Sequence, residues 1–380
     1  MIDTAPVRAF LDERHVTLAA RVSEFATRLI APLAEPTDDN AARAQARDLL
    51  AKLGGAGWFE PIRNQDWRAC CIVREALAGA SPLADAVFAL QGLGVVPILL
   101  SGNDAMRARW LDAAIQGRAM ASFAMTEPEA GTDVASLGMR AEPDAGGDGY
   151  VLSGTKTFIS NAGIADFYTV FATTDRAKKD KGIACFVVPA DTPGLKFVRP
   201  LVLSAPHPLG EISFTKVRVP ASCRLDADGA GFKLGLGTLD RLRSTVGAAA
   251  CGMALRALDE AIAHAKSRKQ FGSRLADFQL IQDKIARMAT ELTAARMLVY
   301  RAAWEKDQGA ARVTLEAAMA KSFATEAAQR IIDEAVQILG GRGVLADHPV
   351  DRLYRSVRAL RIYEGTTEIQ HLIIAGQLLK

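Results

Sequence analysis

The spacing of apolar residues changes twice along this chain of 380 residues, and that change limits the fold more than any other feature. Residues up to about 120, and again from about 230 onward, repeat apolar side chains at the three- and four-residue spacing of helices. Between them lie short runs rich in Val, Ile, Phe and Tyr, separated by turn signals. The pattern predicts a mostly α protein with an N-terminal helical domain (1–120), a small antiparallel, barrel-like β domain (121–229) and a C-terminal antiparallel helix bundle (230–380).

Within the first domain the apolar faces predict several amphipathic helices. Gly54 and Gly55 mark the end of one, and Asp104 is the expected N-cap of the last. The longest apolar run, 92–100, is too short to span a bilayer and contains Pro97, so we interpret it as a buried helix and expect no membrane insertion. The expected helices cover 16–29, 41–53, 67–80, 83–93 and 105–116.

In the middle domain the apolar runs predict strands over 150–154, 167–172, 182–189 and 211–220. The third domain is expected to hold helices over 239–267, 276–309, 313–339 and 348–360. Gly247 and Gly252 permit close helix contact within the Ala-rich segment 239–267. Long Ala-rich helices of this kind are typical of chains that pack against another subunit, so we expect a homo-oligomer.

Composition excludes several classes of protein. The net charge is only +3 and the basic residues are scattered, which gives no nucleic-acid footprint. The five cysteines form no C-x-x-C pair, and the five histidines form no H-E-x-x-H, so no metal site is expected. Neither a P-loop nor a G-x-S-x-G nucleophile motif is present. With charged residues throughout the first turns and no secretory segment, we expect a cytoplasmic protein.

The stretch 361–370, RIYEGTTEIQ, places one carboxylate in a distinctive setting. Glu364 follows Ile362 and Tyr363 and precedes a glycine that lets the backbone turn. Loss of hydration among apolar neighbours raises a carboxyl pKa, which suits a base that takes a proton from carbon. Thr367 and Gln370 predict a capping box that opens a last helix over 369–379. Taken alone, the stretch still favours an ordinary loop acid.

Four stretches together resemble the acyl-CoA dehydrogenase family, in the family's own order. They are FAMTEPEAGTD (123–133), RKQFG (268–272) with Phe278 and Gln279 downstream, QILGG (337–341) and IYEGTTEIQ (362–370). The resemblance covers nearly the whole chain and is weakest in about the first hundred residues. It implies the helix–sheet–helix architecture, an FAD cofactor and the dehydrogenation of an acyl-CoA thioester to its trans-2-enoyl-CoA.

That reaction needs a base for the weakly acidic α-proton and an electron sink for the β-hydride, which no side chain accepts. The resemblance implies that Glu364 is the base. Some relatives carry the base on the helix after the β domain, where Leu242 stands in this sequence and cannot serve. The resemblance also implies that the electrons pass to an electron-transferring flavoprotein.

The resemblance implies a set of cofactor-binding residues, although each motif alone also fits an ordinary turn, strand end or helix cap. Hydroxyl groups at Thr126 and Ser160 match positions that hydrogen-bond the isoalloxazine ring. Arg268 and Phe271 match the pair that reaches the diphosphate and adenine of a neighbouring subunit's FAD, which implies a tetramer or a dimer. The full set is Met125, Thr126, Thr132, Phe158, Ser160, Arg268, Phe271, Gln279, Gln337, Gly340, Gly341, Thr366 and Glu368.

Substrate-binding residues follow from the same resemblance, and three departures from the family pattern stand out. Phe158 replaces the usual tryptophan, Ser356 replaces an aspartate, and SAPHPLGE (204–211) replaces a polar stretch. We interpret His207, within that stretch, as a loop residue and not as a catalyst. The implied substrate-binding residues are Thr132, Asp240, Arg243, Tyr363 and Gly365.

Three functions stay open beside dehydrogenation in fatty acid or carboxylic acid catabolism. They are an acyl-CoA oxidase, an acyl-CoA desulfinase, and a catalytically silent scaffold or CoA-binding homologue. The segments 88–94 and 239–246 are expected to set the depth of the acyl pocket. Their side-chain sizes do not separate short, branched, cyclic or medium acyl groups, and the lack of a basic residue in 88–94 disfavours a dicarboxylyl-CoA.

Overall fold

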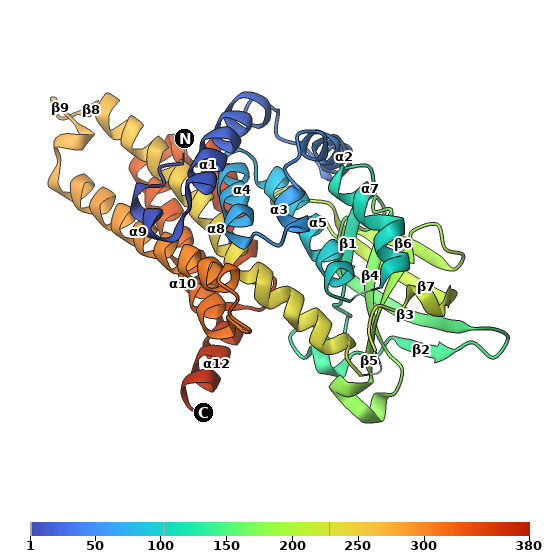
Figure 1. Ribbon diagram of the computed structural model, residues 1–380. Coiled ribbons are helices and arrows are strands. Elements are labelled where there is room, and N and C mark those ends of the chain that lie inside the picture. The colour runs from blue at the N-terminus through green and yellow to red at the C-terminus, as the bar shows by residue number, and fades with distance from the viewer. Residues whose placement is uncertain (1, 102, 228) are drawn as a thin grey trace. The chain divides into compact units, whose positions relative to one another are not determined.

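A computed structural model describes residues 2–101, 103–227 and 229–380. The chain divides into two compact units (Figure 1). The helical unit comprises Met1–Ala34, Asp66–Asp85 and Asp240–Lys380, and the sheet unit comprises Glu35–Gln65 and Ala86–Leu239. The protein is mostly helical with one central β domain, as predicted. The expected boundaries at 120/121 and 229/230 stay a prediction.

Helices make up most of the helical unit and a smaller part of the sheet unit (Figure 1). Those that begin in the helical unit are η1 (Ala5–Phe10), α1 (Glu13–Phe25), η2 (Ala26–Ile30), α4 (Trp67–Ala80), α5 (Pro82–Ser101), η7 (Leu275–Asp277), α9 (Gln279–Asp307), α10 (Thr314–Leu339), η8 (Gly340–Val344), α11 (Pro349–Leu360) and α12 (Thr367–Leu378). Those that begin in the sheet unit are α2 (Asp39–Gly55), α3 (Glu60–Arg63), α6 (Asp104–Met106), η3 (Arg107–Leu111), α7 (Asp112–Ile115), η4 (Val134–Ser136), η5 (Arg176–Gly182), η6 (Ala221–Cys223) and α8 (Gly231–Ser267). Helices α5 and α8 each pass from one unit into the other.

The sheet unit is built on a seven-stranded sheet in the order β1-β4-β2-β3-β7-β6, with β5 paired to β4. Four pairings are antiparallel, but β1 and β2 each run parallel to β4, so the sheet is mixed where an antiparallel one was expected. A parallel pair needs a long crossover, and β2 and β3 supply it between β1 and β4. The strands are β1 (Ala121–Ala124), β2 (Arg140–Pro143), β3 (Gly149–Ser160), β4 (Phe167–Thr173), β5 (Ile183–Pro189), β6 (Leu195–Pro200) and β7 (Leu209–Pro220), with a hairpin of β8 (Lys269–Gln270) and β9 (Ser273–Arg274) in the helical unit.

Two predicted helix starts were wrong. The N-cap before α6 is Asn103, whose side chain accepts from the Met106 amide at 3.0 Å, and the single helix expected over 105–116 is divided among α6, η3 and α7. The cap of α12 is Thr366, which accepts from the Ile369 amide at 3.4 Å, so the capping box of Thr367 and Gln370 does not form. A hydroxyl caps the helix from the residue where the backbone is still extended.

Helix α5 is the one described helix that is long and apolar enough to cross a membrane. It has 20 residues, its most apolar window has a mean hydropathy of 1.9, and the helix continues through Pro97. However, 78% of its most apolar window is buried inside the protein. Burial of this kind is typical of a core helix, as the sequence predicted for 92–100.

Close helix packing organises the helical unit. A Cβ added to Gly252 of α8 would lie 2.0 Å from the Glu75 carbonyl oxygen of α4. A Cβ added to Gly247 would lie 2.7 Å from the Val299 side chain of α9. The predicted role of these two glycines in close helix contact is therefore confirmed, since real Cβ atoms do not approach other atoms so closely.

Candidate active site

Glu364 lies in the short loop between α11 and α12, in a backbone conformation that side chains rarely adopt. Its φ is 54°, and that of the following Gly365 is 94°. Left-handed backbone at a non-glycine residue costs free energy and persists only where the surroundings hold it. The Glu364 side chain is half-buried, and its Oε2 atom is buried with no hydrogen-bond partner among the described residues. An unpaired buried acceptor of this kind is open to a ligand.

Three helices hold the backbone of this loop. Arg243 of α8 donates to the Glu364 carbonyl at 3.5 Å. Lys321 of α10 donates to the Gly365 carbonyl at 2.8 Å, and Gln370 of α12 donates to the same oxygen at 3.0 Å. Lys321 and Gln370 are fully buried, so these contacts replace water in holding the left-handed turn.

The charges around Glu364 oppose one another. Burial raises the pKa of Glu364, and the cations Arg74, Lys321 and Arg243 act against that increase, while Asp85 adds to it. Arg74 is itself neutralised, because its Nε and one terminal nitrogen lie 2.7 and 2.9 Å from the Asp85 carboxylate. The net result is a carboxylate with increased proton affinity, as a base requires.

Of the remaining residues predicted for this region, Asp240 and Thr366 have structural partners, and Tyr363 and Glu368 are exposed. Asp240 accepts from Arg243 and from the Thr314 hydroxyl, at 2.7 Å from the latter. Tyr363 is 38% exposed. Thr366 caps α12, and Glu368 is exposed in its first turn.

In the sheet unit, the loop that begins at Met125 is fixed by a buried ion pair. Lys156 Nζ lies 2.8 Å from the Met125 carbonyl and 2.8 Å from Glu127 Oε1. Glu127 also accepts from the Gly138 and Met139 amides. The loop therefore holds a fixed shape, with Thr126 half-buried beside it.

A second group of predicted residues stands at the end of β3. The pairing of β3 with β7 is irregular between Lys156 and Ile159, and Phe158 within that interval has φ 54° and is 62% exposed. The Ser160 hydroxyl lies 2.8 Å from Nε2 of His207. Thr132 is exposed in the loop after β1.

The predicted nucleotide-side residues of the helical unit are almost wholly exposed. Phe271 is 96% exposed and has φ 50° in the β8–β9 hairpin, and its ring meets that of Phe278 edge to face. The exposed Arg268 has no ion-pair partner among the described residues. Gln279 begins α9 and Gln337 lies in the last turn of α10, and a Cβ added to Gly340 or Gly341 would meet open space.

The residues present fit FAD. Exposed phenyl rings offer flat apolar surface, an unpaired guanidinium offers a phosphate partner, and open glycines allow close approach of a cofactor to the backbone. By the resemblance, Thr126 and Ser160 would hold the isoalloxazine ring, and Arg268 and Phe271 would serve the diphosphate and adenine of a neighbouring subunit's FAD.

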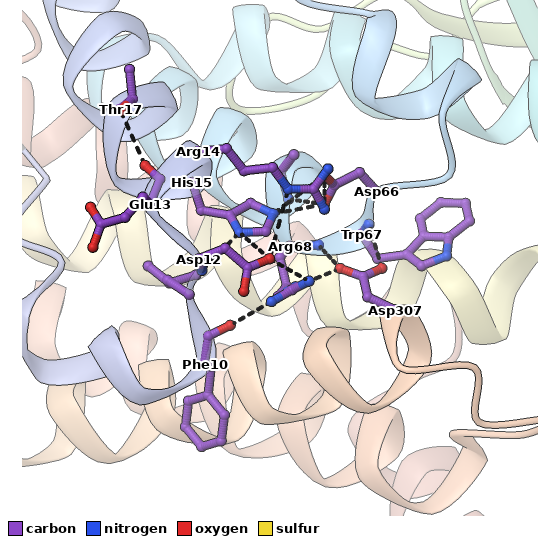
Figure 2. A network of polar contacts seen from close by, with 12 residues as sticks. Phe10, Asp12, Glu13, Arg14, His15, Thr17, Asp66, Trp67, Arg68 and Asp307 are labelled. Atoms are coloured by element: carbon purple, nitrogen blue, oxygen red, sulfur yellow. Dashed lines mark hydrogen bonds and ion pairs between the residues drawn. The ribbon is translucent and has the colours of Figure 1, made fainter.

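One group of metal-ligand residue types occurs among the described residues, formed by His15, Asp66 and Asp307 (Figure 2). Arginine side chains already pair with both carboxylates of this group. Arg14 lies 3.0 Å from Asp66 and Arg68 lies 2.8 Å from Asp307. His15 donates from Nε2 to Asp66 at 3.1 Å, because its Nδ1 accepts from the Asp12 amide. The group is an ion-pair network that joins α1, α4 and α9.

Sequence reasoning missed the charged residues that hold both loops. Lys321 stands among mostly apolar residues, and a lone charge at a buried position of a helical period is the signal that marks it. Lys156 stands between Thr155 and Thr157, so its neighbours do not mark it in this way. Asp85 and Arg74 carry no such signal, since their pairing depends on how α4 turns into α5. His207 was assigned to a loop, and its contact with Ser160 spans 47 residues.

Comparison with known proteins identifies the class. Models of the acyl-CoA dehydrogenase N-terminal, middle and C-terminal domains match residues 12–118, 122–217 and 229–379. The chain belongs to the acyl-CoA dehydrogenase family, whose members are FAD-dependent oxidoreductases, and FAD is its cofactor.

Three relatives are similar over almost their whole length. The 3-(aryl)acrylate reductase of Clostridium sporogenes is 38% identical over 98% of this chain and 100% of its own. Butyryl-CoA dehydrogenase from Megasphaera elsdenii superimposes with a TM-score of 0.90 at 33% identity, covering 97% of this chain and 99% of its own. A chain in the structure of the electron transferring flavoprotein of Acidaminococcus fermentans does so with a TM-score of 0.92 at 33% identity, covering 97% and 99%.

Proposed function

We propose that this protein dehydrogenates an acyl-CoA thioester between its α and β carbons, with Glu364 as the base, and passes the electrons to an electron-transferring flavoprotein. The observation that carries the proposal is the unpaired, buried Oε2 of Glu364 on a loop whose backbone three helices hold. Burial raises the pKa of Glu364, which strengthens it as a proton acceptor. Bound FAD supplies the acceptor for the β-hydride.

The names of two relatives support a substrate class. Butyryl-CoA dehydrogenase acts on a short acyl-CoA, and the name of the C. sporogenes relative describes reduction of a 3-aryl acrylate. Both names fit oxidation or reduction of the carbon–carbon bond next to an acyl carbonyl. We therefore propose a short or aryl-substituted acyl-CoA as substrate, a homo-oligomer in which Arg268 and Phe271 serve a neighbouring subunit's FAD, and a cytoplasmic location.

An anaerobic titration of the purified protein tests the function. The visible absorbance of FAD should bleach with butyryl-CoA or 3-phenylpropionyl-CoA. Glu364→Gln should keep its FAD but reduce the bleaching rate about 10³-fold, within the range of positioned general bases. Glu316→Gln, on α10, is the matched control and should bleach like the wild type.

Other outcomes favour the competing functions. Fast reoxidation of the bleached protein by air favours an acyl-CoA oxidase. A yellow protein that no thioester bleaches contradicts the proposed substrate class, and a protein that takes up no FAD favours the silent CoA-binding or scaffold homologue.

A further inference from the structure

Ser160 and His207 are in contact in the sheet unit, although they lie 47 residues apart in the sequence. Ser160 ends β3, and His207 lies in the segment 204–211 that departs from the family pattern. The Ser160 Oγ atom and the His207 Nε2 atom are 2.8 Å apart, a full hydrogen bond. A serine hydroxyl has one hydrogen and acceptor lone pairs, so this contact uses one of its few bonding options.

The backbone on both sides fixes the geometry of that contact. The Ser160 carbonyl accepts from the Ser122 hydroxyl at 2.6 Å. The next residue, Asn161, has φ 62°, and its backbone N–H donates to the Pro208 carbonyl at 2.9 Å. The strand end and the 204–211 segment are therefore bonded through the backbone directly beside the side-chain pair.

The charged groups that face His207 come from helix α2. Arg43 donates to Asp39 at 2.6 Å and to the carbonyls of Ala162 and Leu209, which surround the same strand end. Burial, aided by Arg43 and opposed by Asp39, lowers the pKa of His207 to about 4. The ring is therefore neutral at physiological pH, with one nitrogen as donor and the other as acceptor.

We propose that His207 is a positioning residue that sets whether Ser160 donates to or accepts from the isoalloxazine ring of FAD, and thereby sets the redox potential of the cofactor. If Ser160 donates to His207, only its lone pairs remain, and they suit a ring nitrogen that carries hydrogen in reduced FAD. If His207 donates, the hydroxyl hydrogen is left for the same nitrogen in oxidised FAD. The inference rests on the proposed placement of Ser160 at the flavin.

The test measures the midpoint potential of bound FAD by anaerobic spectroelectrochemical titration between pH 6 and 8. His207→Ala should change the ratio of reduced to oxidised protein at a fixed potential by about 3- to 10-fold, the worth of one neutral hydrogen bond. That corresponds to about 15 to 30 mV for a two-electron couple. A lower potential identifies Nε2 as the acceptor, and a higher one identifies it as the donor.

Two further variants separate the hydrogen bond from charge and from general loosening. His207→Gln keeps a neutral hydrogen-bonding group near the position of Nε2. Its ratio of reduced to oxidised protein at a fixed potential should therefore lie within about twofold of the wild-type ratio. In a Ser160→Ala background, His207→Ala should cause no further shift, because the effect acts through the serine. Val202→Ala, an exposed neighbour in the same loop, should titrate like the wild type.

The results that overturn the proposal are distinct from failure of the proposed function. If butyryl-CoA or 3-phenylpropionyl-CoA bleaches the wild type while His207→Ala follows Val202→Ala, the positioning role is wrong and the dehydrogenase stands. A shift that persists undiminished in the Ser160→Ala background also overturns it. If His207→Ala loses its FAD, His207→Asn replaces it in the comparison of midpoint potentials with Val202→Ala. The asparagine side chain is too short to reach the position of Nε2. A wild type without FAD removes both proposals.

Discussion

Lys156 in the sheet unit and Lys321 in the helical unit are both fully buried, and each donates to a backbone carbonyl of a loop that carries a predicted site residue. Lys156 reaches the Met125 carbonyl, and Lys321 reaches the Gly365 carbonyl, both at 2.8 Å. Burial lowers the pKa of each lysine to about 8. The two differ in their acidic partners.

Lys156 has a direct partner in Glu127, at 2.8 Å, which in turn accepts from two backbone amides. Its charge is neutralised inside a closed structural network. Lys321 has no carboxylate within ion-pair distance among the described residues, and its charge acts on Glu364 from further away. We infer that the first lysine serves the shape of its loop, and that the second serves both the shape of its loop and the proton affinity of the base.

The largest expected effect follows from replacing Lys156 with methionine. Glu127 then stays buried without its cation, and breaking one side of a buried pair costs about 3–5 kcal/mol of unfolding free energy. Urea denaturation measures that loss, and FAD retention after gel filtration measures the shape of the Met125 loop. We expect both to fall.

Lys196→Met provides the control, since Lys196 is an exposed lysine of β6 in the same sheet. Its unfolding free energy should stay within about 0.5 kcal/mol of the wild type. Equal stability of the Lys156 and Lys196 variants would contradict a structural ion pair at Lys156.

Replacing Lys321 with methionine should cost less stability but change the chemistry. The Gly365 carbonyl keeps its bond from Gln370, so the cost is that of one hydrogen bond to a charged group, at about 1.5–3 kcal/mol. Because a nearby cation holds the pKa of Glu364 down, its removal raises that pKa further. The base must be deprotonated to act, so the acidic limb of the pH profile of kcat/KM should move to higher pH.

This prediction is tested by comparing the acidic limb of the pH profile between the Lys156 and Lys321 variants. The FAD-bound fraction of Lys156→Met should keep the wild-type position of the acidic limb, and so should the exposed control Lys266→Met. If the limb moves equally in the Lys156 and Lys321 variants, or in neither, the two lysines do not differ in the way proposed.

Periodicity predicted the long helices because burial of one face requires it. Helix α4 falls on the predicted residues, with Asp66 accepting from the Ala69 amide at its start. Strand β6 was missed because nearly all of its residues are exposed, which leaves no alternation to detect. Strands β1 and β2 were also missed, because a strand of four residues is too short to show a clear alternation.

Only the parts of the candidate site that depend on neighbouring residues in the sequence could be predicted. The apolar neighbours of Glu364 and the glycine after it marked this stretch in the sequence. However, the N-cap of α12 is Thr366 and not the predicted Thr367, because distant donors set the turn at Glu364 and Gly365. Lys321 lies more than forty residues from that loop and Arg243 more than a hundred. Contacts at such separations depend on the packed fold, which spacing along the chain does not specify.

The smallest expected effect tests the cost of keeping Glu364 ready as a base. Its folded-state pKa is raised, so the folded protein binds this proton more tightly than the unfolded chain does. The resulting stability is fully present below the unfolded pKa and is lost as pH rises through the folded one. Glu364→Gln does not titrate. Its unfolding free energy relative to the wild type should therefore increase from pH 4.5 to pH 8, by less than the Lys321 effect.

Urea denaturation at both pH values measures this difference, and comparing the two cancels the part due to the amide itself. Glu316→Gln should show no such increase, and a flat difference for Glu364→Gln would mean that burial does not penalise the charged carboxylate, leaving only the held backbone to explain its role.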